Sequence, residues 1–199
     1  MQYMQTTRGF GLLEGFLSRQ RALIANKYIP KNSRSGRILD IGCGVYPLFL
    51  ISSEFKEKYG IDKIDFTNIS NDSGANLINM DIEKIDILPF IDEFFDAVTM
   101  LAVFEHLSPD RIANVLNEVH RVLRKDGIFI ITIPAGWTDR LLRILAKLKL
   151  VSSEEIDEHK DTYNFSKIDF LFKNSNFRNS SFQFGYFEMF MNMYFSIVK

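Results

Sequence analysis

The stretch Arg37-Ile38-Leu39-Asp40-Ile41-Gly42-Cys43-Gly44 decides the fold of this chain. Its first five residues form a short, mostly apolar run with β-branched side chains, which is typical of a buried strand. The Gly-Cys-Gly that follows predicts a tight turn where the strand ends. Pro47 suits the first turn of a helix, where its missing N–H has no partner to lose. We therefore expect a strand, a glycine turn and a short helix over residues 47–54.

Downstream, segments typical of strands alternate with segments typical of helices. The expected strands span residues 37–41, 58–62, 76–80, 95–101 and 128–133. The clearest helix begins at Ser108-Pro109 and has Gly127 as its stop. Its apolar residues follow helical spacing; they are Ile112, Val115, Leu116, Val119 and Leu123. Between Asp62 and Asp81 the chain is rich in Asn, Ser and Asp, so only a stunted helix is expected there.

The two ends of the chain add helices and a pair of strands. Residues 10–28 predict an amphipathic helix that ends before Pro30, with an inward face of Leu13, Phe16, Leu17, Leu23 and Ile24. A basic amphipathic helix is expected over residues 138–150, and a capped helix from Ser166. The alternating aromatic and apolar residues of 182–186 and 193–197 predict two strands with no helix between them.

Alternating strands and helices predict a parallel sheet with helices on both faces. Two consecutive strands without a crossover helix predict an antiparallel hairpin at one edge. The expected fold is therefore α/β: a doubly wound, mostly parallel, seven-stranded sheet with a C-terminal antiparallel hairpin.

Composition limits the classes of function. The 199 residues carry 24 Lys and Arg against 25 Asp and Glu, a net charge of −1, so we expect no nucleic-acid partner. Cys43 is the only cysteine, which excludes an intrachain disulfide and favours a reducing compartment. The start of the chain does not resemble a signal peptide, and no run of about 18 apolar residues occurs. We expect a single cytoplasmic domain without a transmembrane segment or a metal site.

Phenylalanine is unusually frequent, with 19 residues in the chain. Nine lie among the last 35 residues: Phe165, Phe170, Phe172, Phe177, Phe182, Phe184, Phe187, Phe190 and Phe195. Because they follow helical or alternating spacing, we expect most of them in the core and the remainder in an apolar pocket.

Three acids are expected at the carboxyl ends of successive strands: Asp40, Asp62 and Asp81. In a doubly wound sheet, ligands bind at this edge, beside the first strand. Asp62 lies 22 residues after Asp40, a spacing at which an acid at the second strand can bind ribose hydroxyls. The alternative is that Gly42 and Gly44 only make a structural turn, Asp81 caps a turn and Asp62 faces water.

Five motifs in unbroken order, covering about residues 36–134, resemble those of the class I S-adenosylmethionine-dependent methyltransferases. They are residues 38–44, 59–62, 79–81, 94–98 with 105–107, and 118–127. The likeness is closest to the small-molecule branch, which includes ubiquinone-type and sugar or glycolipid methyltransferases. The sequence departs from the family pattern at Tyr46-Pro47, where many members have a third glycine.

The resemblance implies a Rossmann-like methyltransferase fold and S-adenosylmethionine as cofactor. It divides the chain into an N-terminal helical cap (1–30), a cofactor-binding core (36–134), a lid (135–165), and a closing helix and hairpin (166–199). The implied cofactor-binding residues are Asp40, Gly42, Cys43, Gly44, Tyr46, Asp62, Asp81, Ile82, Leu101 and Ala102.

Roles follow from the same resemblance. The residues of the glycine turn surround the methionine part, Asp62 binds the ribose, and Asp81 with the backbone of Ile82 meets the adenine. Leu101 and Ala102 line the cofactor near its reactive methyl.

The implied reaction moves a methyl group to a small or carrier-linked acceptor, such as a sugar or glycolipid hydroxyl. A hydroxyl must lose a proton as it attacks, so a base is needed for that class of acceptor. The candidate bases are His106 and His159; the alternatives are a hydrogen-bonded histidine at a helix start and a residue that fixes a loop. The helix over 138–150 has a net charge of +3, so it either lies over the sheet or contacts an anionic membrane or a lipid-linked acceptor.

Two other functions share parts of this pattern. A nicotinamide-dependent oxidoreductase would also use the glycine turn and the ribose-binding acid, but Pro47 occupies the place of its third glycine. A non-catalytic relative could bind a second protein through its aromatic surface. Oligomeric state does not follow from the sequence.

Overall fold

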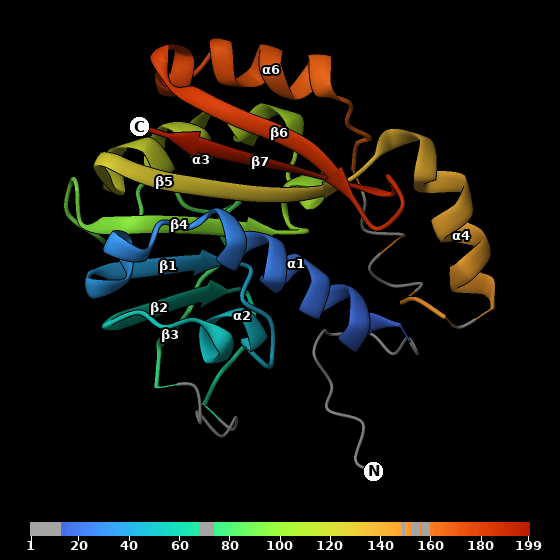
Figure 1. Cartoon of the computed structure of the whole chain (residues 1–199), viewed down its shortest axis with the longest axis horizontal. Coiled ribbons are helices and arrows are strands. Elements are labelled where there is room, and N and C mark those ends of the chain that lie inside the picture. Colours follow the sequence, from blue (N-terminus) through green and yellow to red (C-terminus); the bar gives the residue numbers. More distant parts are fainter. Residues whose placement is uncertain (1–12, 68–73, 149, 153–155, 157–159) are drawn as a thin grey trace.

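The computed structural model describes residues 13–67, 74–148, 150–152, 156 and 160–199. Its centre is a seven-stranded sheet in the order β3-β2-β1-β4-β5-β7-β6 (Figure 1). The strands are β1 (Arg37–Ile41), β2 (Glu57–Asp62), β3 (Asn76–Asn79), β4 (Phe95–Leu101), β5 (Leu123–Pro134), β6 (Ser181–Phe187) and β7 (Asn192–Val198). The strands β1 to β5 are parallel, whereas β7 pairs antiparallel with both β5 and β6. The predicted doubly wound sheet with a closing hairpin is confirmed.

Strand β1 lies between β2 and β4, so the chain winds in opposite directions from it. The register places Asp40 beside Gly60 on one side and beside Thr99 on the other. Because the strand order reverses here, the loops after β1 and β4 diverge and leave a crevice at the carboxyl edge of the sheet.

Helices cover both faces of the sheet. They are α1 (Glu14–Tyr28), α2 (Leu48–Ser52), α3 (Pro109–Val122), α4 (Asp139–Lys147) and α6 (Phe165–Lys173), with 3₁₀ turns η1 (Lys31–Ser35), η2 (Phe104–His106), η3 (Gly136–Thr138) and η4 (Asn176–Asn179). The core splits accordingly into two clusters of buried side chains. One cluster includes residues of α1 and α2, and the other includes residues of α3 and α6.

The inward face of α1 differs from the prediction. Ala22 and Ala25 are buried, whereas Phe16 is 54% exposed and Leu23 is 61% exposed. The small alanine side chains let the helix backbone approach the sheet closely, while Leu17 and Ile24 are only partly buried and Phe16 and Leu23 lie on the outside.

The start of α1 is joined to the segment that follows α4. Leu13 donates its backbone N–H to the carbonyl of Leu150 at 2.9 Å, and Ser152 donates its N–H to Glu14 Oε1 at 2.7 Å. Glu14 is only 6% exposed, so this bond satisfies a buried carboxylate.

Helix α3 ends at Val122, five residues before the predicted stop at Gly127. Leu123 is fully buried and already pairs with Phe95, so β5 begins there rather than at Ile128. Gly127 lies inside the strand, where an added Cβ would come 2.8 Å from the carbonyl oxygen of Arg124. The glycine is therefore explained by a close backbone approach and not by a helix cap.

Helix α4 buries only part of its apolar face. Leu141 and Leu145 are half-buried, while Ile144 and Leu148 are 56% and 63% exposed. Helix α6 begins one residue before the expected Ser166 and is capped by Asn164, whose side chain accepts from the N–H of Lys167 at 3.0 Å.

The expectation that most C-terminal phenylalanines lie in the core was wrong. Of the nine, only Phe172, Phe177 and Phe195 are buried, and Phe170 and Phe190 are 64% and 68% exposed. For Phe182, Phe184 and Phe187 the reason is topological, because they lie on β6, the last strand of the sheet, and no described strand pairs with its outer side.

Two expected absences and one expected helix can be examined in the described residues. None of their helices is long and apolar enough to span a membrane. They contain no cluster of three or more His, Cys, Asp or Glu side chains arranged for a metal ion. Between Asp62 and Asp81, residues 63–67 and 74–80 form no helix, and residues 68–73 lie outside the described part.

Candidate cofactor pocket

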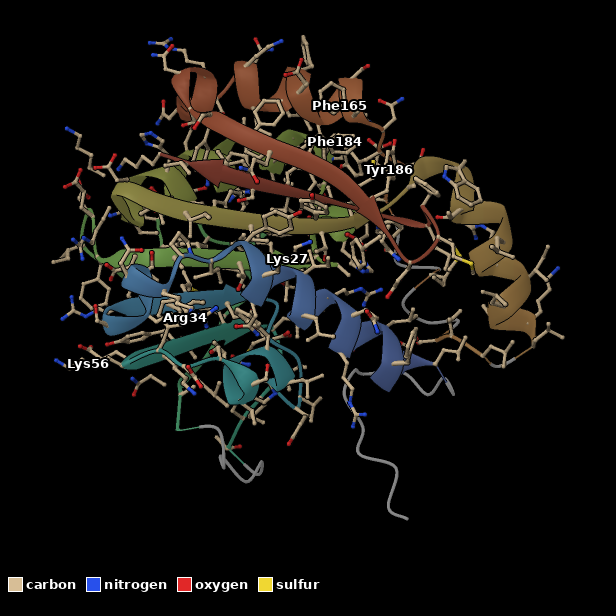
Figure 2. The ribbon with its side chains drawn as sticks, viewed as in Figure 1. Lys27, Arg34, Lys56, Phe165, Phe184 and Tyr186 are labelled. Atoms are coloured by element: carbon tan, nitrogen blue, oxygen red, sulfur yellow. The ribbon has the colours of Figure 1, made fainter. Side chains whose placement is uncertain are left out.

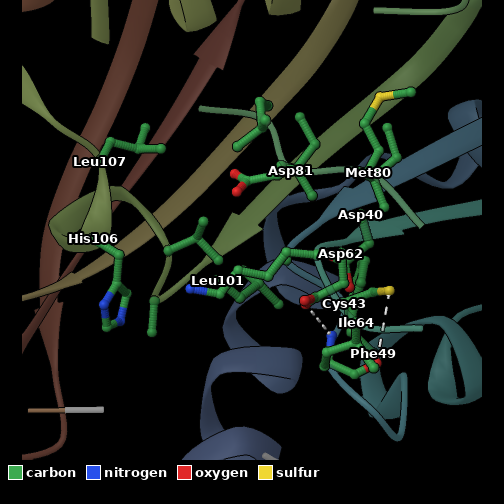
Figure 3. Close-up of a pocket in the computed structure, with 18 of the residues that line it drawn as sticks. Asp40, Cys43, Phe49, Asp62, Ile64, Met80, Asp81, Leu101, His106 and Leu107 are labelled. Atoms are coloured by element: carbon green, nitrogen blue, oxygen red, sulfur yellow. Dashed lines mark hydrogen bonds between the residues drawn. The ribbon is translucent and has the colours of Figure 1, made fainter. Parts of the chain in front are cut away.

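A cavity of about 440 Å³ opens at the carboxyl ends of β1, β2 and β4 (Figure 3). All ten expected cofactor-binding residues line it: Asp40, Gly42, Cys43, Gly44, Tyr46, Asp62, Asp81, Ile82, Leu101 and Ala102. His106 lines it too, whereas His159 lies outside the described residues. The volume falls in the range of pockets that bind small molecules and cofactors.

The glycine turn after β1 depends on both glycines. Gly42 has φ +77° and Gly44 has φ +75°, a region that other residues rarely adopt. A Cβ on Gly42 would lie 2.2 Å from Cγ2 of Val103, so the loop after β4 packs directly on this backbone. The turn brings main-chain atoms to the floor of the cavity.

Asp62 is fixed toward this turn and does not merely face water. Its Oδ2 accepts a hydrogen bond from the backbone N–H of Gly44 at 2.9 Å (Figure 3). Asp81, in contrast, does cap a local turn, since its Oδ1 accepts from the N–H of Glu83 at 3.1 Å and its Oδ2 pairs with Lys84 at 3.0 Å. Lys84 is 81% exposed in its side chain, so that ion pair is weak and open to exchange.

Asp40 is the most deeply buried acid of the three, at 4% exposed. Burial raises its pKa to about 7; the hydrogen bond from Thr99 Oγ1, at 2.7 Å, opposes this shift, and the negative charge of Asp62 adds to it. The pocket thus holds a carboxylate that is costly to ionise.

This predicts a pH-dependent stability. The folded pKa of Asp40 is raised above its unfolded value of 3.8, so the folded state holds the extra proton between about pH 4 and pH 7. The free energy of unfolding therefore falls as pH rises through this window and is level above it. Asp40→Asn keeps an acceptor for Thr99 and lacks the charge. Without ligand it should be more stable than the parent at pH 8, by on the order of 4 kcal/mol, and not at pH 4.

Urea denaturation of both proteins across pH 4–8 measures this difference. Parallel stability curves for the parent and Asp40→Asn would show that Asp40 is ionised at the same pH in the folded and unfolded chains.

Cys43 lines the cavity as a packing residue. It is 7% exposed, and burial raises the pKa of its thiol, with the charges of Asp40 and Asp62 acting in the same direction. A Cβ on Gly60 of β2 would lie 2.8 Å from Cys43 Sγ, so the sulfur fills the space above this glycine. A thiol held protonated in this way is a poor nucleophile.

The loop after β4 forms the opposite wall. Ala102 has φ +57°, and its N–H donates to the carbonyl of Thr132 at 3.0 Å. This left-handed residue turns the chain out of the sheet and leads into η2, which holds His106. In Figure 3, His106 lies across the pocket from Asp62, with Leu101 between them in the view.

Sequence reasoning missed the wall made by α1. Ser18 and Arg21 line the cavity, and Arg21 Nε is buried without a hydrogen-bond partner among the described residues. The signal was the spacing of Ser18, Ala22 and Ala25, small residues on one helical face, which indicates close packing. Lys160 was missed as well; it lines the cavity and its Nζ contacts Glu83 Oε2 at 2.5 Å and Ser108 Oγ at 2.9 Å.

The expectation that some C-terminal phenylalanines line an apolar pocket stays a prediction, because they do not line this cavity. The phenylalanine that lines the cavity is Phe49 of α2, and none of the nine C-terminal ones does so.

Comparisons with known proteins agree with this geometry. Residues 39–131 match the family model described as a methyltransferase domain. The chain superposes on a SAM-dependent methyltransferase from Archaeoglobus fulgidus with a TM-score of 0.67 and 18% identity over 94% of each chain. Together these matches support a class I S-adenosylmethionine-dependent methyltransferase.

Two curated proteins are similar to this chain in sequence. One is a carboxy-S-adenosyl-L-methionine synthase from Campylobacter fetus, 23% identical over 79% of this chain and 66% of the relative. The other is the ubiquinone/menaquinone biosynthesis C-methyltransferase UbiE from Geotalea daltonii, 30% identical over 53% of this chain and 46% of the relative. This chain thus spans about half to two thirds of the length of the two relatives.

Proposed function

We propose that this chain transfers a methyl group from S-adenosylmethionine to a hydroxyl of a small or carrier-linked acceptor, such as a sugar or a glycolipid. The observation that carries the proposal is the convergence of Asp40, Asp62 and Asp81 in one cavity of about 440 Å³ at the point where the strand order reverses. These acids suit the hydroxyl and amino groups of the cofactor, which donate hydrogen bonds.

The residues of the pocket fit the cofactor part by part. Asp62, already oriented by Gly44, would bind the ribose hydroxyls. Asp81 and the backbone of Ile82 would meet the adenine, and Asp40 with the glycine turn would meet the methionine part. The absence of a Cβ at Gly42 lets Val103 pack directly on the glycine turn, and Tyr46 stands where the third glycine of the family pattern would be.

The bound cofactor would supply an activated methyl group. The chain's own task is then to hold the acceptor in line with that group and to exclude water. His106 lines the same wall as Leu101 and Ala102, so its imidazole could accept the proton that a hydroxyl loses. Replacement of His106 by alanine should slow transfer to hydroxyl acceptors while leaving cofactor affinity unchanged.

Arg21 adds a cationic group on the side of α1. The charge of Arg21 already acts on the carboxylate of Glu188, but its buried Nε has no hydrogen-bond partner among the described residues. A hydrogen-bond acceptor on the bound molecules would therefore be favourable beside it.

Calorimetric titration of the full chain tests the cofactor assignment. S-adenosylhomocysteine should bind with a micromolar Kd, and NAD should not bind. Binding of NAD alone would support an oxidoreductase instead. Transfer of labelled methyl groups to a panel of hydroxyl compounds then tests the acceptor class, and cofactor binding without any transfer would point to a non-catalytic relative.

A further inference from the structure

Strand β6 forms an edge of the sheet with unusual chemistry. It pairs with β7 over all seven residues without a register shift, and among the described elements nothing pairs with its other side. Its sequence, Ser-Phe-Gln-Phe-Gly-Tyr-Phe, contains no charged residue and no proline. Edge strands of monomeric proteins are usually protected by charges, proline or a bulge, because a bare edge can pair with another strand. None of these devices occurs within β6.

A continuous row of aromatic side chains follows this edge. We call it the aromatic row; it consists of Phe165, Phe182, Phe184, Tyr186 and Phe190. Ring centroids are 6.2 Å apart for Phe165 and Phe182, 4.8 Å for Phe165 and Phe184, 5.0 Å for Phe184 and Tyr186, and 5.8 Å for Tyr186 and Phe190. Figure 2 shows Phe184 and Tyr186 along β6, with Phe165 of α6 beside Phe184.

The exposed area of this row is large. Phe165 is 38% exposed, Phe182 36%, Tyr186 44% and Phe190 68%. At about 200 Å² for each aromatic side chain, the row presents roughly 400 Å² of apolar surface. Contact between two such rows would bury roughly 800 Å² of apolar surface. Stable interfaces begin at about 1,200 Å² of total buried surface. The two paired strand edges and their neighbouring residues would supply the difference.

We propose that two copies of this chain associate through β6, antiparallel, about a two-fold axis at Phe184. The sheet would then continue across the dimer as fourteen strands. The partner is a second copy because β6 is complementary to itself. With Phe184 opposite Phe184, Phe182 faces Tyr186 and Gln183 faces Gly185, so all seven residues are paired.

Side-chain parity supports this register. In an antiparallel pair, directly opposite residues point to the same face of the sheet, and a shift of one residue reverses the faces. The axis at Phe184 places the aromatic residues of both copies on one face and joins the two aromatic rows. An axis between Phe184 and Gly185 would place aromatic side chains opposite Gln183 and Gly185 and divide the rows.

Sedimentation of the full chain tests the association. The parent should be a dimer, and Phe182→Lys with Tyr186→Lys should weaken it by at least about 100-fold, because the register places lysine opposite lysine. The matched control is Phe170→Lys, which changes a phenylalanine that is 64% exposed on α6 and outside the row. A monomeric parent, or a folded double variant that dimerises like the control, would overturn the proposal.

Cysteine cross-linking tests the register and does not depend on the lysine variants folding. In Phe184→Cys the two thiols would be directly opposite, at a separation that a disulfide can bridge. In Phe182→Cys they would be four residues apart along the strands, about 13 Å, which is too far. Oxidation should therefore link the first variant and not the second, while the parent, whose Cys43 is buried, stays unlinked. Equal linking of both variants would contradict an axis at Phe184. Neither experiment depends on methyl transfer.

Discussion

Replacing Asp62 with alanine is expected to weaken the binding of S-adenosylhomocysteine by at least about 100-fold. A carboxylate that accepts hydrogen bonds from two ribose hydroxyls contributes roughly 1.5–3 kcal/mol for each bond, so the loss of both has an effect of this size. The substitution also leaves the N–H of Gly44 without its acceptor, which loosens the glycine turn.

Two further variants separate these contributions. Asp62→Asn can still accept from Gly44 but lacks the charge, so its affinity should lie between those of the parent and Asp62→Ala. Asp65→Ala is the matched control, since Asp65 is a nearby acid that caps the N–H of Thr67 and does not line the cavity. Calorimetry gives the Kd of each protein. An Asp62→Ala variant that binds like Asp65→Ala would refute the ribose assignment.

Replacing Gly42 with alanine is expected to destabilise the chain by about 3 kcal/mol or more. A left-handed backbone costs a residue with a Cβ about 1–2 kcal/mol. The new methyl would in addition lie 2.2 Å from Val103 Cγ2, and overpacking of this kind typically costs 1–3 kcal/mol. Cofactor affinity should fall as well, because relief of the clash moves the turn or the loop after β4.

A second substitution distinguishes strain from the clash. Val103→Ala removes both Cγ atoms, so Gly42→Ala with Val103→Ala should recover the clash contribution and keep the backbone penalty. Urea denaturation of the parent, both single variants and the double variant gives this coupling energy. Strictly additive effects would mean that the two side chains do not meet.

The fold could be predicted because strand β1 and its glycine turn are governed by local rules. Burial on both faces requires the apolar residues Ile38, Leu39 and Ile41, and positive φ requires glycine at 42 and 44. Both demands are readable from residue type alone. The same is true of Asp62, whose position follows from the length of one β-α-β unit.

The rest depended on contacts between distant segments. The boundary between α3 and β5 moved from Gly127 to Leu123 because Leu123 finds a pairing partner in Phe95, 28 residues earlier. Arg21 joined the pocket because α1 packs through Ala22 and Ala25, which periodicity of large apolar residues cannot reveal. The C-terminal phenylalanines have the alternation of core strands, yet one of their strands is an edge, and alternation does not distinguish the two.

The bond between Glu14 and Ser152 has a consequence for how the chain is made. Strands β1 to β5 are complete once residue 134 has been made. The donor to Glu14 is the N–H of Ser152, which lies 138 positions after Glu14 and is made later. Until residue 152 has left the ribosome, packing α1 in its final place would bury a carboxylate without a partner. The helix that carries Ser18 and Arg21 is thus expected to dock late in synthesis, so that a nascent chain has its five parallel strands before it has a closed binding site.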